Sequence, residues 1–478
     1  MKREIYLDCA FGFMRAAVVE DGRLCELLCE RACAKKLTET IFLGRVEQIR
    51  PSVGAAFVNI GEELNAFLPL EDGHTLRCGD MIIVQGAAKQ ATETKGLRVT
   101  SRVNLAGKWL VLIPGESGIH VSKKVKAPEL RAALAEIAAQ ICPQGFGLIV
   151  RTASEDVTVE AMQEEAEALS VRWQAISMKA AAQRKPGVLS EQLTLDLRVA
   201  RDLAGKELES IVTNDSSCYN RLKEEQAAGR IPAKTSISCL KETGQLLFDL
   251  SGIEPQIDKA LKRRVWLPCG GYLIIDPCEA MTVIDVNSGK MTLGRNTEDT
   301  ALSVNLEAAD EIARQIRLRD IGGIIVVDFI DMEQSEHREM LLSRMKDAVK
   351  ADRSPVKVEG ITRLGLLEMT RKRVKASLLK TLKAPCTYCS SSGDLIAPEE
   401  IAQRALRQVK RTVLSGHRGP FIIHCAQGAA NALCAIRTGR DAQVFVVPAT
   451  SRHAERFEIE QIGENAPLPK GAVALIKD

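Results

Sequence analysis

Short runs in which apolar and polar residues alternate open the chain, and this alternation predicts β-strands. Residues 1–35 contain three of them, EIYLDCA, MRAAVVE and RLCELLCE. Residues 36–101 contain further runs with Gly and Pro between them, IFLGRVEQI, GAAFVNIG, NAFLPL, MIIVQG and LRVTSR. Regularly spaced short strands over this length favour a small barrel.

Helical spacing begins further along the chain. Residues 102–196 mix strands with a long helical segment that ends before Pro186. Residues 197–260 have an α/β pattern, residues 261–382 follow the order strand–loop–helix–strand–helix, and residues 397–478 form a small α/β unit. The pattern predicts a multidomain α/β protein with a barrel near its N-terminus.

Length and composition narrow the class of protein. The chain has 478 residues, of which 45% are hydrophobic and 27% charged, as is ordinary for a soluble globular protein. This length corresponds to about three domains. We find no run of about 18 apolar residues that would predict a transmembrane helix, and the first residues lack the apolar segment of a signal peptide. We therefore expect a cytoplasmic protein with no membrane partner.

Basic residues are grouped along the chain. The net charge is only +3, which by itself does not indicate nucleic acid binding. A solvated face explains any one group, but three groups on one chain favour a polyanionic partner. The groups are the six basic residues from Arg371 to Lys383, then Lys259, Lys262, Arg263 and Arg264, and finally Lys123, Lys124 and Lys126.

A predicted β-α-β unit brings two carboxylates to one edge of a sheet. The strand AMTVIDVN points Asp285 and Asn287 to the same side. A helix spans residues 305–320, and the next strand, IIVVDFIDM, holds Asp328 in its interior. Strands joined in this way are parallel, with a right-handed crossover, and ligands collect at their carboxyl edge.

A carboxylate inside such an apolar strand is costly unless it is paired. One interpretation is structural, with Asp328 capping a helix or paired with an arginine. The other is a pair of carboxylates that binds a hard cation, and Mg²⁺ suits two carboxylates completed by waters. A hydrated Mg²⁺ can activate a water and offset the charge of a phosphate. This second interpretation predicts metal-assisted phosphate chemistry, with Asn287 holding a carboxylate or a phosphate oxygen.

The predicted barrel offers an aromatic side chain to a nucleic acid. In GAAFVNIG, Phe57 alternates with Ala56, Val58 and Ile60. If Val58 and Ile60 fill the core, Phe57 lies outside, where a base can stack on it. The alternative is that Phe57 and Phe67 both belong to the core.

The 14 cysteines are scattered through a chain in which we expect no export signal, and this predicts reduced thiols. Cys25, Cys29 and Cys33 are spaced to share one face, where they can pack as small apolar residues or hold a metal. Cys386 and Cys389 form a C-x-x-C pair, which is half of a tetrahedral zinc site. A redox pair or no special role remains open, and a second copy of the chain could supply the missing half.

Several motifs together resemble the ribonuclease E/G endoribonucleases over essentially the whole chain. In the second half they are IDVNSGK (284–290), residues 305–332, LGLLEMTRKR (364–373) and APCTYCSSSG (384–393). Upstream they are residues 44–70, 94–107 and 145–153. In length the chain is more similar to the ribonuclease G branch than to full-length ribonuclease E.

The resemblance implies a fold for each segment. A ribonuclease-H-like unit would comprise residues 1–35 and 197–260, with an OB-fold barrel of the ribosomal S-one type (36–101) and a 5′-end sensor (102–196) inserted in it. A deoxyribonuclease-I-like catalytic unit (261–382), a zinc link (383–396) and a small C-terminal α/β domain (397–478) would follow.

The resemblance also implies roles for single residues. Asp285 and Asp328 would hold the catalytic Mg²⁺, assisted by Asn287. RNA would be bound by Phe57, Phe67 and Lys95; the alternative for Lys95 is a solvated lysine. The 5′-monophosphate would be sensed by Gly107, Val111, Arg151 and Thr152, because a guanidinium and a hydroxyl suit a terminal phosphate.

Two further features concern the sensor and the assembly. Pro355 stands where the family has an arginine or lysine behind the phosphate pocket. Arg353 or Lys357 could take over that role; otherwise, sensing of the 5′ end is weaker.

Cys386 and Cys389 would share one structural Zn²⁺ between two protomers, and these dimers would pair into tetramers.

The activity implied is hydrolysis within single-stranded, A/U-rich RNA that leaves 5′-monophosphate products, in mRNA decay and in rRNA and tRNA processing. One alternative is a non-catalytic RNA-binding or ribosome-associated protein, which the intact set of Asp285, Asn287 and Asp328 disfavours. Another is a different phosphodiesterase or a DNA nuclease, which the barrel and the basic groups disfavour. The sequence does not identify protein partners.

Overall fold

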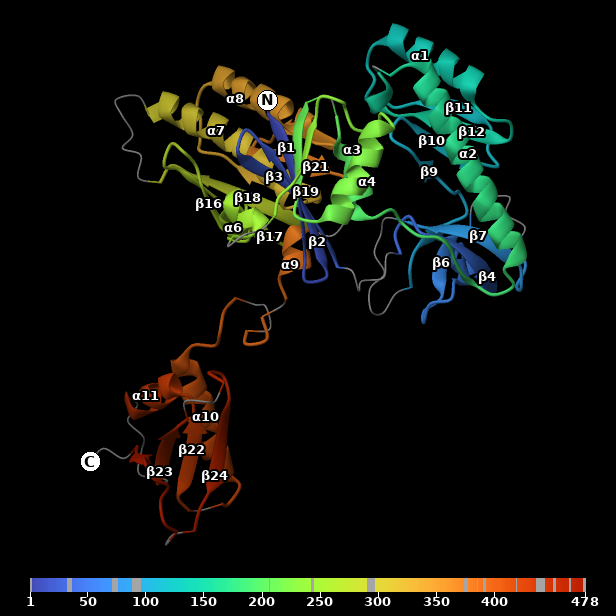
Figure 1. Ribbon diagram of the computed structural model, residues 1–478. Helices are drawn as coiled ribbons and strands as arrows, with labels where there is room; N and C mark the ends of the chain where they lie inside the picture. Colours follow the sequence, from blue (N-terminus) through green and yellow to red (C-terminus); the bar gives the residue numbers. More distant parts are fainter. Residues whose placement is uncertain are drawn as a thin grey trace. The chain divides into compact units, whose positions relative to one another are not determined.

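The structure is a computed structural model. It describes residues 2–31, 37–70, 76–87, 96–155, 157–205, 207–241, 245–289, 297–373, 377–384, 386–389, 393–417, 419–435, 443–449, 453–463 and 466–475. The chain divides into two compact units, Met1–Leu382 and Lys383–Asp478. Figure 1 labels the elements of both units along the sequence.

The first sheet joins two segments that are far apart in the sequence. Its strand order is β15-β14-β1-β2-β3, with β1 antiparallel to β2 and parallel to β14. The three predicted N-terminal strands are confirmed as β1 (Arg3–Ala10), β2 (Phe13–Glu20) and β3 (Arg23–Arg31). The later elements are α3 (Leu195–Leu203), β14 (Leu208–Thr213), α4 (Ser216–Ala227), β15 (Ser236–Cys239), α5 (Leu247–Leu250) and α6 (Glu254–Ala260).

Cys25 lies in a β-bulge of β3, where the register with β2 shifts by one residue. The bulge interrupts the alternation on which a shared face for Cys25 and Cys29 was expected. Burial, and then the nearby Glu20 carboxylate, raise the pKa of Cys25 to about 12. Such a thiol stays protonated and packs as a small apolar side chain. Cys33 lies outside the described residues.

The predicted barrel is a nearly closed antiparallel sheet with the order β6-β5-β4-β7-β8, to which β13 adds beside β4. Its two ends approach each other where Phe67 N donates a hydrogen bond to Leu97 O (2.7 Å). The elements are β4 (Ile41–Arg50), the 3₁₀ helix η1 (Pro51–Val53), β5 (Ala55–Asn59), β6 (Ala66–Pro69), β7 (Met81–Gly86), β8 (Val99–Thr100) and β13 (Gly187–Ser190).

A four-stranded sheet with the order β11-β12-β10-β9 shares a hydrophobic core with β4 of the barrel. The predicted long helix is confirmed as α2, which begins after Thr158, whose hydroxyl accepts a hydrogen bond from Ala161 N (3.3 Å). In Figure 1, α2 extends from this sheet toward the barrel. The elements are β9 (Leu105–Ala106), β10 (Leu110–Pro114), β11 (Gly118–Val121), α1 (Pro128–Ile141), β12 (Phe146–Val150), η2 (Thr152–Ser154) and α2 (Val159–Ala182).

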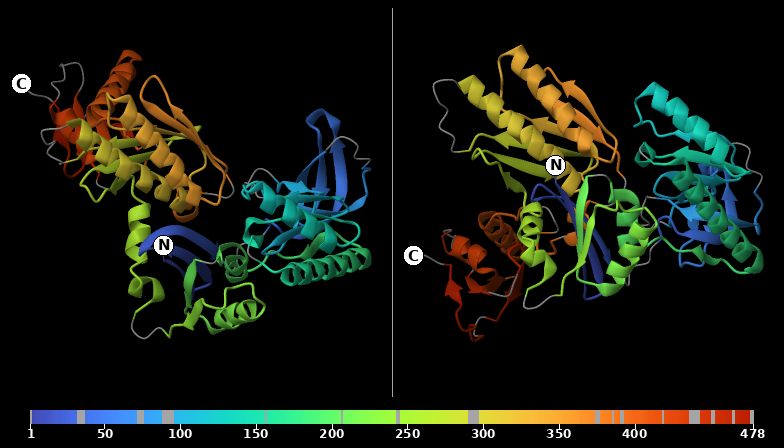
Figure 2. Two further views of the ribbon diagram at one scale, coloured as in Figure 1. Left: turned by 90° about the horizontal axis from the view of Figure 1, so that it is seen from above. Right: turned by 45° about the horizontal axis from the view of Figure 1, so that its top comes forward.

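A mixed sheet with the order β16-β17-β18-β19-β21-β20 forms the last part of the first unit. Helices α7 and α8 run side by side along one face of this sheet (Figure 2) and bury it in an apolar core. The elements are β16 (Arg264–Trp266), β17 (Tyr272–Pro277), β18 (Met281–Asn287), α7 (Thr297–Leu318), β19 (Gly323–Asp328), α8 (Ser335–Ala348), η3 (Val349–Ala351), β20 (Val356–Ile361), β21 (Leu366–Arg371) and α9 (Leu378–Leu382). The opposite face of the sheet, called the open face below, carries the exposed side chains of its strands.

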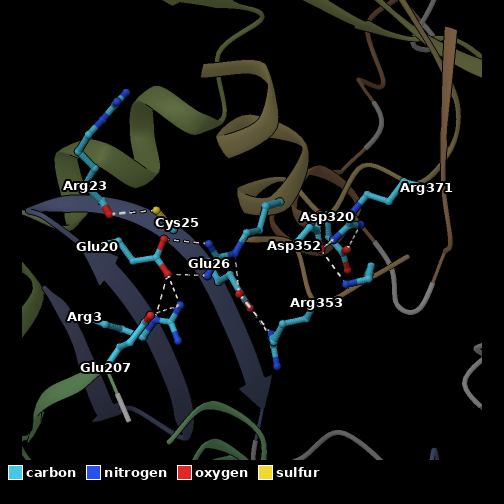
Figure 3. Close-up of polar contacts among 12 residues, drawn as sticks. Arg3, Glu20, Arg23, Cys25, Glu26, Glu207, Asp320, Asp352, Arg353 and Arg371 are labelled. Atoms are coloured by element: carbon cyan, nitrogen blue, oxygen red, sulfur yellow. Dashed lines mark hydrogen bonds and ion pairs between the residues drawn. The ribbon is translucent and has the colours of Figure 1, made fainter. Parts of the chain in front are cut away.

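A network of ion pairs joins the first sheet to α7 and to the loop before β20 (Figure 3). Arg317 of α7 donates hydrogen bonds to Glu20 (2.8 and 2.9 Å) and to Glu26 (2.8 Å). Arg353 also binds Glu26, from the loop before β20. Burial raises the pKa of Glu26, but Arg353 and Arg317 more than offset this effect, and the pKa falls to about 2. The network therefore contributes to holding the mixed sheet against the N-terminal sheet.

One member of the predicted basic groups has a structural role. Arg371 is only 5% exposed and is bound by Asp320 and by Asp352, the latter at 2.7 Å from Nε (Figure 3). A buried, doubly paired guanidinium is not part of a solvated or RNA-binding face. That expectation is therefore wrong for Arg371.

The second unit is a small α/β domain with the strand order β24-β22-β23-β25 and its own core. Its elements are α10 (Pro398–Leu414), β22 (Phe421–Cys425), α11 (Gln427–Ala435), β23 (Val444–Pro448), β24 (Phe457–Gln461) and β25 (Val473–Ala474). None of the helices described in either unit is long and apolar enough to cross a membrane.

Candidate active site

Asp285 and Asp328 lie side by side on the open face of the mixed sheet. Strands β18 and β19 are parallel neighbours, as the β-α-β pattern predicted, and their register places Asp285 directly opposite Asp328. Both carboxylates are exposed. The Nδ2 atom of Asn287, two residues along β18, donates a hydrogen bond to Oδ2 of Asp285 (2.7 Å). The three predicted residues therefore form one cluster.

The position of Asp328 differs from the one expected. It is the last residue of β19 and is exposed, whereas the apolar run that continues after it had suggested the interior of a buried strand. The run continues because Phe329 and Met332 return to the core after the strand has ended. A structural carboxylate buried within a strand is thereby excluded.

Other carboxylates lie close to Asp328. Partial burial, then the carboxylates of Asp285 and Asp331, raise the pKa of Asp328. Like charges this close favour binding of a proton or a cation between them. Among the described residues, however, no group of three Cys, His, Asp or Glu side chains is arranged to hold a metal ion. A cation at this pair would keep much of its shell for water or substrate oxygens.

The loop after Asp328 is held by two residues of α7 that the sequence analysis did not single out. Asn305 is fully buried and pairs with Ile330 in both directions, Nδ2 to O (2.8 Å) and N to Oδ1 (3.0 Å). Glu298 accepts hydrogen bonds from the backbone N–H groups of Glu333 and Gln334 (both 3.1 Å). These bonds hold the loop that directly follows Asp328 against α7.

The turn after Asn287 requires a glycine. Gly289 has φ +65°, and a Cβ atom there would lie 2.3 Å from Gly270 O. This close approach packs the turn between β16 and β17 against the end of β18. The backbone that carries Asn287 is therefore supported from the neighbouring hairpin.

The barrel presents two aromatic rings on its surface. Phe57 and Phe67 are directly opposite each other on β5 and β6, with ring centroids 6.1 Å apart in an edge-to-face arrangement. Both are half-buried, whereas Val58 is 0% and Ile60 2% exposed. The predicted alternation is confirmed, and the alternative that both rings fill the core is wrong. Lys95, the third residue expected here, lies outside the described residues.

The residues expected to sense a 5′-phosphate gather at one end of the β9–β12 sheet. Arg151 follows β12 and donates hydrogen bonds to Gly107 O and to Oδ1 of Asp202 (2.8 Å). Thr152 is exposed, with its hydroxyl 3.2 Å from that of Ser122. Val111 lies nearby on β10, opposite Ile149 of β12.

A carboxylate on α2 shapes the same end of the sheet. Glu165 accepts hydrogen bonds from the backbone N–H groups of Lys108, Trp109 and Leu110 (2.8, 2.8 and 2.9 Å). A Cβ atom at Gly107 would lie 2.5 Å from the Glu165 carboxyl carbon. Position 107 therefore accepts only glycine without displacing Glu165.

Arg353 and Lys357, the two candidate substitutes for a cation at Pro355, have their ionic partners elsewhere among the described residues. Arg353 is bound to Glu26, and Lys357 pairs with Glu359 (2.7 Å). Arg353 does line a cavity of about 130 Å³ together with Asp202 and other residues. The Arg151 guanidinium is instead oriented by Asp202, a residue that the sequence gave no reason to select.

Comparison with known proteins shows the family of this chain. A sequence model described as the Ribonuclease E/G family matches residues 104–374. Ribonuclease G of Salmonella typhimurium is 34% identical over 454 residues, which cover 91% of this chain and 92% of that protein. The chain belongs to the ribonuclease E/G family of endoribonucleases. Two relatives named Ribonuclease E are longer: that of Synechocystis is 37% identical over 373 residues (74% of this chain, 55% of that protein), and that of Escherichia coli is 33% identical over 497 residues (96% and 46%).

The C-x-x-C pair of this ribonuclease E/G chain lies at the start of the second unit. Hydrogen bonds from the backbone of Cys389 and Tyr388 lower the pKa of Cys386. A thiolate stabilised by backbone N–H groups is the form that binds zinc. His453 contacts this loop twice: its Nε2 donates a hydrogen bond to Tyr388 O, and its ring lies against that of Tyr388 with centroids 4.3 Å apart. The described residues supply no third ligand to the pair.

Proposed function

We propose that this ribonuclease E/G family member is an Mg²⁺-dependent endoribonuclease that cleaves single-stranded, A/U-rich RNA and leaves 5′-monophosphate products. Its place would be in mRNA decay and in the processing of rRNA and tRNA. The observation that carries the proposal is the juxtaposition of Asp285 and Asp328, with Asn287, on an exposed sheet face. Two adjacent carboxylates open to solvent can hold a cation and still admit a phosphodiester.

The residues at this face fit a magnesium ion. Asp285 and Asp328 would hold it through their carboxylates, and the crowding that raises the pKa of Asp328 would be relieved by its charge. When bound, Mg²⁺ supplies a polarised water and offsets the negative charge of the phosphate. Asn287 keeps the Asp285 carboxylate oriented through the hydrogen bond from Nδ2, while Asn305 keeps the end of β19 in place.

The barrel would hold the RNA strand beside the cleavage site. Exposed aromatic rings stack on bases whatever their sequence, with about 1–3 kcal/mol for each base. Phe57 and Phe67 are suited to this role because their rings are exposed in part and Arg50 lies 5.6 Å from the Phe57 ring centroid, where it adds positive charge. We assign Lys95 to the same path on the resemblance alone.

The 5′ end of the RNA would bind at Arg151 and Thr152. A terminal phosphate would accept hydrogen bonds from the guanidinium and the hydroxyl, with Gly107 and Val111 supplying the backbone around it. Because Asp202 already pairs with Arg151, a phosphate has to compete with a carboxylate for the same guanidinium. Position 355 also holds a proline and not an arginine or lysine. Both features support a lower affinity for a 5′ phosphate than a pocket with two unpaired cations would have.

The assembly proposed is a dimer through one Zn²⁺ held by Cys386 and Cys389 of two protomers, with dimers pairing into tetramers. The lowered pKa of Cys386 supports thiolate ligation. In the same scheme the first sheet is the ribonuclease-H-like unit and the mixed sheet is the deoxyribonuclease-I-like unit. The barrel is the OB fold, residues 383–396 are the zinc link, and the rest of the second unit is the small C-terminal domain.

The test is cleavage of a 5′-labelled single-stranded RNA by the purified protein with Mg²⁺ or with EDTA. We expect cleavage only with Mg²⁺, and products that a 5′-monophosphate-dependent exonuclease degrades. Asp285→Asn and Asp328→Asn should each reduce kcat by at least about 10²-fold while RNA binding and thermal stability change little, since only the charge at the metal site is lost. Cleavage by either variant at a rate near that of the wild type would show that the metal site is elsewhere.

A further inference from the structure

Two rows of side chains cross the open face of the mixed sheet in register. In one row Trp266 of β16 is opposite Tyr272 of β17, which is opposite Asn287 of β18. In the next row Arg264 is opposite Ile274, Ile274 is opposite Asp285, and Asp285 is opposite Asp328. Directly opposite residues point to the same face of a sheet. Trp266, Tyr272 and Arg264 thus share the face of the proposed catalytic carboxylates.

Trp266 and Tyr272 form an aromatic cluster on this surface. Their ring centroids are 5.2 Å apart at an interplanar angle of 61°. Trp266 is 60% exposed, although a tryptophan side chain contributes a large apolar area when it is buried. The alternating Leu273 and Ile275 fill the core under α7, so the sheet does not need the Trp266 ring for packing.

Arg264 lies beside the aromatic cluster and can bind an anion. The Arg264 guanidinium carbon lies 4.6 Å from the Tyr272 ring centroid and 5.7 Å from that of Trp266. Within the part of the chain that the structure describes, Arg264 pairs with no carboxylate, whereas the neighbouring Arg263 is bound by Asp276. Lys259 and Lys262, both exposed, precede it in the sequence. The second basic group of the sequence thus leads directly into the aromatic cluster.

The distance from the aromatic rings to the carboxylates suits a nucleotide next to the scissile phosphate. Adjacent strands are about 4.8 Å apart, so Tyr272 is one spacing and Trp266 two spacings from the strand of Asp285 and Asn287. A base stacked on these rings would therefore lie roughly 5–10 Å from the line of catalytic residues. Its phosphate would be within reach of the Arg264 guanidinium, which presents several N–H donors.

We propose that Trp266 and Tyr272 form a base-stacking subsite for single-stranded RNA beside Asp285 and Asp328, with Arg264 binding the adjoining phosphate. The proposal rests on the proposed function and adds to it a contact for the nucleotide that flanks the cleavage site. Stacking on exposed rings tolerates any base, so this subsite would position the strand and leave sequence preference to other contacts. We assign RNA as the occupant because the rings share one face with the carboxylates and are accompanied by Arg264, for which no described residue supplies a carboxylate partner.

The first measurement is RNA affinity in the non-cleaving Asp285→Asn background of the full chain. Trp266→Ala should weaken binding of a single-stranded oligoribonucleotide by roughly 5- to 150-fold, the range that base–aromatic stacking spans. Trp266→Phe keeps a stacking ring and should stay within about threefold. Met340→Ala is the matched control, because Met340 is 52% exposed but lies on α8, which covers the other face; it should leave the affinity unchanged.

The second measurement locates the contact along the RNA. Oligoribonucleotides with 5-iodouridine at single positions on either side of the cleavage site are irradiated with the protein, and the linked peptide is identified by mass spectrometry. We expect linkage to Trp266 or Tyr272 from a position next to the cleavage site and from no distant position. Linkage to these residues only from distant positions, or no effect of Trp266→Ala on affinity, would overturn the subsite.

The outcomes separate this proposal from the proposed function. If the wild type cleaves with Mg²⁺ and Asp285→Asn does not, while Trp266→Ala binds and cleaves as the wild type does, the subsite is wrong and the proposed function stands. If the wild type does not cleave RNA with Mg²⁺, the proposed function fails, and the affinity series still decides whether RNA stacks on Trp266. A change in oligomeric mass on Trp266→Ala with unchanged RNA affinity would show that a second copy occupies this face and would also overturn the subsite.

Discussion

Neighbouring residues of β5 should separate the proposed RNA binding from stability. Phe57→Ala should weaken single-strand binding by about 1–3 kcal/mol and change the melting temperature little, because its ring is only half-buried. Val58→Ala should do the opposite, with RNA affinity kept and about 1–3 kcal/mol of stability lost, because Val58 is 0% exposed. Fluorescence anisotropy and thermal unfolding of both variants check this. A large loss of stability in Phe57→Ala would mean that the ring belongs to the core.

Asn305 should matter to catalysis without touching RNA. Asn305→Ala would leave the N–H and C=O of the partly buried Ile330 without the side chain that now pairs with both. We expect a stability loss of about 1–3 kcal/mol and a lower kcat with nearly unchanged KM, because the end of β19 would no longer be fixed. Glu336→Ala, at an exposed position on α8, is the control. A variant that is destabilised but keeps its kcat at a temperature where it is folded would contradict the positioning role.

The sequence predicted the face on which a side chain lies wherever apolar and polar residues alternate along a strand. Alternation correctly placed Val58 inside and Phe57 outside the barrel, and it placed Asp285 and Asn287 on one side of β18. It failed at Asp328, because an apolar run does not show where the strand ends within it. It also gave no sign of Asn305 or Asp202, since each acts by a hydrogen bond to a residue far along the chain.

At the scale of elements, the ion-pair network around Glu26 should make the free energy of unfolding fall as the pH becomes acidic. The folded pKa of Glu26 is about 2, below its ordinary value of 4.5, so the ionised form is favoured by folding. This contribution is complete above about pH 4.5 and is lost as the pH falls toward 2. Urea unfolding at pH 7, 4.5 and 3 should therefore show a fall in stability of the order of 1–3 kcal/mol that is smaller in Glu26→Gln. An equal fall in both proteins would assign the acid sensitivity to other carboxylates.

At the scale of elements, local patterns predicted strands, helices and the β-α-β unit, but only some of their pairings. Parallel β18 and β19 followed from the helix between them. The pairing of β1 with β14 has no local signal, because the barrel and the β9–β12 sheet intervene in the sequence; only the resemblance placed residues 1–35 and 197–260 together. The β-bulge at Cys25 was equally hidden, since an added residue changes the register without changing the composition of β3.

At the scale of the whole molecule, the first unit contains the open face, the barrel and the residues proposed to bind the 5′ phosphate, while the C-x-x-C pair belongs to the second unit. The pair has two ligands where a structural zinc site has four. The same pair from a second chain would complete the proposed site with four thiolates. Catalytic and assembly functions would then reside in different units of one chain.

A shared site predicts one zinc for every two chains. Cys386→Ser or Cys389→Ser should lose the metal and shift the protein to smaller species, because formation of the zinc–thiolate bonds contributes to association. Cys239→Ser is the control, since that thiol is also exposed but lies in the first unit. Elemental analysis and light scattering measure both effects.

Cleavage should fall in the Cys386 and Cys389 variants if an RNA is bound by more than one protomer. The remaining activity should keep its Mg²⁺ dependence, because Asp285 and Asp328 are unchanged. One zinc for each chain, or an unchanged oligomer after substitution, would contradict sharing and leave this pair a closed or redox role.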